Sequence, residues 1–96
     1  MRLLYIVTYD ICDDSRWRKV FKIMHGHGDH LQYSVFRCML SDLERIGLLE
    51  KLSTVIKHDT DQVLMFPLGP VDGLDALRVV AIGLPLAPMH RGAIIV

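Results

Sequence analysis

The sequence is poor in cysteine and has no long hydrophobic run. Its 96 residues include two cysteines, Cys12 and Cys38, which are too few for a disulfide scaffold and match no zinc-binding spacing. The apolar stretch after Arg2 is too short for the core of a signal peptide, and the uncharged run 79–89 is too short for a transmembrane helix. We therefore expect a cytoplasmic protein with reduced thiols and no membrane partner.

An excess of one charge is also missing, since eleven Lys and Arg balance eleven Asp and Glu. A nucleic-acid partner would therefore need a local basic patch or a symmetric assembly. The length, with a mass of 10.9 kDa and 51% apolar residues, predicts one folded domain over residues 1–96. That apolar fraction is high for so short a chain, which predicts burial of apolar surface against a second copy in a homodimer.

The N-terminal part of the chain predicts a strand and an amphipathic helix. Residues 3–9 have apolar side chains on both faces, which is typical of a central strand, and this strand stops at Asp10. Helix-start signals follow at 13–15. The helix is expected to end at Gly26 and Gly28, because glycine tolerates the left-handed conformation common after a helix C-terminus. The apolar face of this helix is predicted to be Trp17, Val20, Phe21 and Met24.

The next part predicts further strands and a second helix. Residues 31–40 alternate as an extended segment, either one kinked strand or two short strands, because no turn dipeptide interrupts it. A capping box at 41–44 begins a helix that is predicted to end near Lys57. A strand over 63–68 follows, and Pro67 places its end at a sheet edge or a bulge. The apolar face of the second helix is predicted to be Leu43, Ile46, Leu49, Leu52, Val55 and Ile56.

This order of elements predicts an α+β fold. The expected architecture is a split βαβ sandwich, β-α-β(β)-α-β, with two helices on one face of a small antiparallel sheet. Residues 69–96 are expected to form an extended C-terminal tail. We predict that this tail adds a strand to its own sheet or to that of a partner subunit, at the dimer interface.

Asp10 is the sharpest candidate for chemistry, because it is an ionisable residue at the end of a buried strand. Such a carboxylate suits Mg²⁺, and two copies of Asp10 across a two-fold axis would hold one ion beside a phosphodiester. The alternative is a carboxylate that caps the loop before the helix, and spacing alone favours this capping role. His25, His27 and His30 lie among glycines and are more typical of a turn than of a metal cluster.

The first predicted helix has a basic flank formed by Arg16, Arg18, Lys19 and Lys22. These residues are candidates for phosphate contacts in nucleic acid, and the alternative is an ordinary solvated helix surface. Residues 1–37 contain six basic and four acidic groups, whereas residues 38–96 contain five and seven. This distribution leans slightly toward the nucleic-acid role.

Blocks of the sequence match a known family. They are Tyr9-Asp10-Ile11, the QYSVF stretch 32–36 and the DQV stretch 61–63. The chain resembles the CRISPR-associated protein 2 family in these blocks. The resemblance extends to Asp13-Asp14, the basic helix positions, Cys38 and, more loosely, residues 80–83.

The resemblance implies a ferredoxin-like homodimer that works with an integrase subunit to capture foreign DNA fragments as new CRISPR spacers. It also implies Mg²⁺-dependent endonuclease activity on single-stranded RNA or duplex DNA, with Asp10 as catalytic metal ligand. The basic helix residues would contact the DNA backbone. The residues implied near the central dimer groove are Tyr9, Ser34 and Phe36.

Two other functions stay open beside the nuclease. One is a non-catalytic adaptor that bridges integrase subunits on DNA, and the least favoured is a small ligand-sensing domain of the same fold. Arg37 departs from the acidic residue that many relatives have after the QYSVF block, and this departure changes the local charge.

Overall fold

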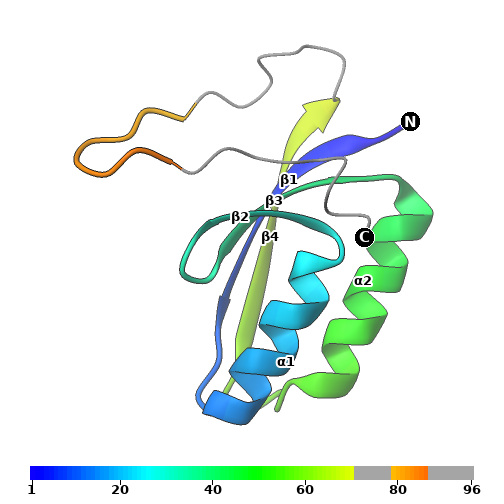
Figure 1. Ribbon diagram of the computed structural model, residues 1–96. Coiled ribbons are helices and arrows are strands. Elements are labelled where there is room, and N and C mark those ends of the chain that lie inside the picture. Colours follow the sequence, from blue (N-terminus) through cyan, green and yellow to red (C-terminus); the bar gives the residue numbers. More distant parts are fainter. Residues whose placement is uncertain (71–78, 87–96) are drawn as a thin grey trace.

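The structure is a computed structural model that describes residues 1–70 and 79–86. These residues form one antiparallel sheet with strand order β2-β3-β1-β4, and both helices cover one of its faces (Figure 1). The predicted α+β sandwich is confirmed, and the first strand lies inside the sheet as its two apolar faces predicted. The elements are β1 (Leu3–Asp10), α1 (Asp14–His25), β2 (Gly28–Gln32), β3 (Val35–Leu40), α2 (Asp42–Val55) and β4 (Gln62–Pro70).

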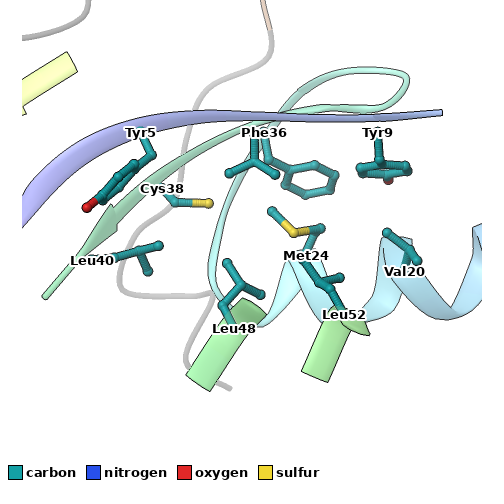
Figure 2. Packing of buried hydrophobic residues seen from close by; sticks show 10 residues of the cluster. Tyr5, Tyr9, Val20, Met24, Phe36, Cys38, Leu40, Leu48 and Leu52 are labelled. Carbon is teal, nitrogen blue, oxygen red and sulfur yellow. The ribbon is translucent and has the colours of Figure 1, made fainter. Parts of the chain in front are cut away.

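Strand β1 sends alternate side chains to the two faces of the sheet. Tyr5, Val7 and Tyr9 face the helices and are buried, whereas Asp10 ends the strand on the open face and is exposed. The hydrophobic core lies between the sheet and the helices (Figure 2). Its buried members are Tyr5, Val7, Tyr9, Val20, Met24, Phe36, Cys38, Leu40, Leu48 and Leu52.

Helix α1 begins where the sequence predicts, because Asp13 is its N-cap and accepts a hydrogen bond from the backbone N–H of Arg16 at 2.9 Å. The helix ends at His25 with Gly26 as its C-cap, but Gly26 has φ −79°, so the predicted left-handed cap is wrong. Gly28 instead opens β2. A Cβ atom there would lie 2.6 Å from the Sγ of Cys38, so close packing between strands requires this glycine.

Helix α2 starts at the predicted capping box. The Ser41 hydroxyl accepts a hydrogen bond from the Glu44 N–H at 3.2 Å, and the Glu44 carboxylate accepts one from the Ser41 N–H at 2.8 Å. Two of the backbone N–H groups that lack a partner within the helix are thereby satisfied. The helix ends at Val55, close to the predicted end.

The predicted apolar face of α2 is wrong over its first half. Leu43 and Ile46 are 82% and 51% exposed, and Leu49 is also exposed. Leu48, which was not predicted, is buried together with the predicted Leu52, since residues four apart stack on one side of a helix and α2 turns that side toward the core. Tertiary packing therefore selects one apolar stripe and leaves the other in solvent.

The extended segment predicted over 31–40 is two strands, β2 and β3, and β2 begins earlier, at Gly28. Tyr33, between them, has φ 32°, which allows the chain to turn without a turn dipeptide. Strand β4 lies at the edge of the sheet, and its register against β1 shifts so that Leu68 is skipped after Pro67. The predicted edge or bulge position of Pro67 is confirmed.

The C-terminal tail is described only in part. Strand β4 extends to Pro70, and residues 79–86 form neither helix nor strand. Residues 71–78 and 87–96 lie outside the described residues, so the additional strand at a dimer interface stays a prediction. In the described ranges, no helix has the length and apolar character needed to cross a membrane.

Candidate functional site

Asp10 lies exposed at the end of β1, on the sheet face opposite the helices. Its backbone pairs with Gln62, the first residue of β4. The N-cap of α1 is Asp13, so the capping role that spacing favoured for Asp10 belongs to a neighbour. Within residues 1–70 and 79–86, none of the hydrogen bonds or ion pairs uses the Asp10 carboxylate. This carboxylate is therefore available to a cation.

The Asp10 carboxylate is not part of a cluster of metal ligands in the described residues. Among the described residues, no group of three His, Cys, Asp or Glu is placed to hold a metal ion. The histidines are used in local structure: a ring nitrogen of His27 lies 2.8 Å from the Ile23 carbonyl, and one of His30 lies 2.8 Å from the Tyr33 carbonyl. Because Mg²⁺ usually takes one or two carboxylates and keeps several waters, one exposed carboxylate is within the range of protein ligands that this ion uses.

A second carboxylate, Asp61, lies just before Gln62 and was not among the predicted site residues. Its side chain is completely buried and accepts five hydrogen bonds. Arg16 donates two of them, from Nε at 2.8 Å and Nη2 at 3.2 Å, and the backbone N–H groups of Cys12 and Lys57 donate at 2.9 and 2.8 Å. The fifth donor is the Thr60 hydroxyl at 3.3 Å.

The surroundings of Asp61 keep it ionised. The Arg16 guanidinium and, next, the backbone N–H groups of Cys12 and Lys57 hold the pKa of this carboxyl well below its usual range, against the opposing effect of burial. The only sequence signal was the DQV block 61–63, which was a part of the family resemblance and did not show that a charge would be buried there.

The predicted phosphate contacts fall into two groups. Arg16 is held by Asp61, and its side chain is 26% exposed. Arg18, Lys19 and Lys22 lie exposed on α1. Lys19 and Lys22 line a shallow groove between α1 and α2, which Lys51 and His27 also line. The structure thus leaves three of the four predicted cations on an open surface.

The structure places Tyr9, Ser34 and Phe36 in or beside the core, on the helix side of the sheet. The rings of Tyr9 and Phe36 stack at a centroid distance of 6.2 Å, and the Trp17 indole N–H donates to the Ser34 hydroxyl at 3.0 Å. Burial raises the pKa of the Tyr9 phenol to about 12. Tyr9 is therefore neutral at physiological pH, and its side chain does not lie on the face that presents Asp10.

Arg37, the departure from the family pattern, lies on β3. It donates a hydrogen bond to Asp29 on β2 at 3.0 Å, and both side chains are largely buried. Because the two charges pair within one chain, the local charge introduced by Arg37 is balanced by its own sheet.

The fold and the site together define a small ferredoxin-like protein that presents one carboxylate at a strand end beside a basic helix. A family model described as CRISPR associated protein Cas2 matches residues 1–72, and the chain belongs to this family.

Relatives of this family are similar over nearly the whole chain. The CRISPR-associated endoribonuclease Cas2 1 of Rhodospirillum rubrum is 44% identical over 92 residues, which cover 96% of this chain and 89% of the relative. The CRISPR-associated endoribonuclease Cas2 of Geobacter sulfurreducens is 42% identical over 96 residues, with both chains covered completely.

Solved structures share the fold. The crystal structure of Streptococcus pyogenes Cas2 at pH 6.5 matches with a TM-score of 0.69 and 25% identity, over 82% of this chain and 100% of that chain. A hypothetical protein from Thermus thermophilus, TT1823, matches with a TM-score of 0.74 and 28% identity, over 91% and 100%. The sandwich predicted from the order of elements is thus also the fold of its relatives.

Proposed function

We propose that the chain is a Mg²⁺-dependent endonuclease of CRISPR spacer acquisition, which hydrolyses phosphodiester bonds of RNA or DNA as a homodimer. The main observation behind this proposal is the Asp10 carboxylate, which is exposed at the end of β1 and unused by the interactions of the described residues. Relatives named as endoribonucleases, at 42% and 44% identity, support it.

The open face of the sheet supports the homodimer. Strand β4 exposes Leu64, Phe66 and Leu68 at 42%, 47% and 50%, and Ile6 of β1 pairs with Phe66 there. Covering such a patch is favourable by ~25 cal/mol per Å² of apolar area. Because Asp10 lies on the same face, a two-fold contact through it would bring two Asp10 carboxylates to one cleft.

The described part of the tail supports the same interface. Val80, Ile82 and Leu84 are exposed at 88%, 97% and 90%. Large apolar side chains gathered in one exposed segment are typical of a contact surface. We propose that these side chains pack against the partner subunit, and that the tail adds its strand to the sheet at this interface.

Two Asp10 carboxylates fit the oxygen ligands that Mg²⁺ takes from proteins, with waters in the remaining positions. The bound ion would supply Lewis-acid activation of the phosphodiester and of a water molecule. The chain itself would hold the ion at Asp10 and bind the nucleic-acid backbone with cations on its helix side. Those cations are Arg18, Lys19 and Lys22 on the surface of α1, and Arg16 in the orientation set by Asp61.

The test is cleavage of single-stranded RNA and duplex DNA by the purified protein with Mg²⁺, using Asp10→Asn, which keeps the size of the side chain. Asp59→Asn, in the exposed turn before β4, is the matched control for loss of one negative charge. We expect Asp10→Asn to lose cleavage by about two orders of magnitude or more and Asp59→Asn to retain it. Equal cleavage by wild type and Asp10→Asn would contradict the proposal.

The second candidate is a non-catalytic adaptor that bridges integrase subunits on DNA. The observation that favours it is the single carboxylate, since the described residues hold no cluster of metal ligands within one chain. An adaptor predicts that Asp10→Ala leaves spacer acquisition intact in cells. Charge reversal of Arg18 and Lys19 would then weaken both DNA binding and acquisition, whereas the nuclease predicts that Asp10→Ala abolishes cleavage.

A further inference from the structure

Asp61 joins three segments that are far apart in the sequence. Its carboxylate accepts from Cys12 in the turn after β1, from Arg16 on α1 and from Lys57 just after α2. Burying a charged carboxylate costs free energy unless it is paired and hydrogen-bonded, and Asp61 meets that requirement with five bonds. One side chain thus ties the turn after β1 to the segment that leads into β4.

Both ties lie directly beside Asp10. Cys12 follows Asp10 by two residues, and its thiol also donates to the Thr60 carbonyl at 3.0 Å. On the other strand, Asp61 precedes Gln62, whose backbone pairs with that of Asp10. The contacts of Asp61 therefore restrain the chain after Asp10 and the chain across from it.

We propose that Asp61 is a positioning residue for the Asp10 carboxylate, and that it also fixes Arg16 at the same end of β1. This inference rests on the proposed metal-dependent function of Asp10. A ligand that is already ordered loses less conformational freedom when an ion binds, so the restraint favours ion binding at Asp10. Asp61 contacts neither the ion nor the nucleic acid.

The chain provides its own control at the other end of β1. Arg2 donates to Glu44 through Nε and Nη2, both at 2.9 Å, so the chemistry of this pair repeats that of Arg16 and Asp61. The two pairs stand at opposite ends of the eight-residue strand β1, which spans about 23 Å from its first to its last residue. Glu44→Gln therefore removes a carboxylate–guanidinium pair without touching the Asp10 end.

The first measurement is the Mg²⁺ dependence of cleavage by wild type, Asp61→Asn and Glu44→Gln. Loss of a supporting residue commonly weakens metal affinity by 10-fold to 100-fold. We expect Asp61→Asn to raise the Mg²⁺ concentration for half-maximal cleavage roughly tenfold, with the rate at saturating Mg²⁺ changed less, and Glu44→Gln to match wild type. A general loss of stability would not produce this split. An unchanged Mg²⁺ dependence in a folded Asp61→Asn protein would overturn the inference.

The second measurement needs no cleavage and separates this inference from the proposed function. Amide hydrogen exchange reports whether the Cys12 N–H is held by Asp61. We expect slow exchange in wild type and in Glu44→Gln, and loss of protection in Asp61→Ala. Fast exchange of the Cys12 amide in wild type would overturn the inference even if every Asp61 variant fails to fold. If Asp10→Asn retains full cleavage while Cys12 is protected, the proposed function is wrong, and what stands is that Asp61 restrains the chain beside Asp10.

Discussion

The two ends of β1 use the same pair of chemical groups for different purposes. At the start of the strand Arg2 and Glu44 pair on the surface, with side chains 59% and 41% exposed, whereas at its end Asp61 is completely buried against Arg16. Each pair lowers the pKa of its carboxyl, that of Glu44 to about 2. Exposed pairs contribute little because solvent screens them, and the removal of one partner from a buried pair leaves a charge without compensation. The exposed Arg2–Glu44 pair is therefore a local contact. The buried Asp61 carboxylate, which joins three segments, is a structural anchor.

The largest expected effect is a loss of stability when the carboxylate of the buried pair is replaced. Asp61→Asn replaces one acceptor oxygen with a donor facing the Arg16 guanidinium and the Lys57 N–H. We expect the thermal midpoint to fall by roughly 10 °C or more, and that of Glu44→Gln by about 2 °C or less. Circular dichroism melts of both variants measure the difference. Equal shifts would mean that burial does not distinguish the pairs.

The next effect is the pH dependence of stability. The folded-state pKa of Asp61 lies below its unfolded value, so its contribution is fully present above the unfolded pKa, near 4, and is lost as the pH falls through the folded pKa. We expect wild type to lose stability from about pH 5 downward, and Asp61→Asn to lose clearly less over the same range. Urea denaturation between pH 6 and pH 2.5 tests this. Parallel curves for the two proteins would contradict the assignment.

A smaller effect concerns the surface cations at each end. Lys19→Glu reverses one charge on α1, after the Asp10 end of β1, whereas Arg45→Glu makes the same change in net charge on α2. We expect the α1 variant to weaken duplex binding about tenfold or more and to flatten its salt dependence. The second variant should bind like wild type. Binding isotherms at several salt concentrations give both values.

The smallest effect lies on α2, whose first turn carries the surface pair. Gly47 is in the helix interior, and a Cβ atom there would meet nothing within 4 Å. Gly47→Ala should therefore stabilise the protein by about 1 kcal/mol. Gly28→Ala should destabilise it, since its Cβ would lie 2.6 Å from the Cys38 Sγ. Chemical denaturation measures the change in the free energy of unfolding of both variants, and we expect opposite signs for the open site at Gly47 and the packed site at Gly28.

Local signals predicted most of the elements. Alternation identified β1, the Asp13 and Ser41 caps marked both helix starts, and Pro67 marked the edge strand. The buried face of α2 could not be predicted, because both Leu43 and Leu48 are apolar and the choice between stripes depends on what the helix packs against. The start of β2 was also missed, since Gly28 reads locally as a helix terminator and its real constraint is contact with β3.

In the candidate site, too, some features follow from the local sequence and others depend on the tertiary structure. The sequence by itself determined that Asp10 ends a strand and that α1 has a basic flank, because these features depend on neighbours within a few residues. Only the tertiary structure decided that Asp61, 49 residues beyond Cys12, takes the Cys12 N–H and the Arg16 guanidinium. A buried charge is stable only where the fold brings several hydrogen-bond donors together, and no local sequence pattern predicts which donors the fold will bring to Asp61.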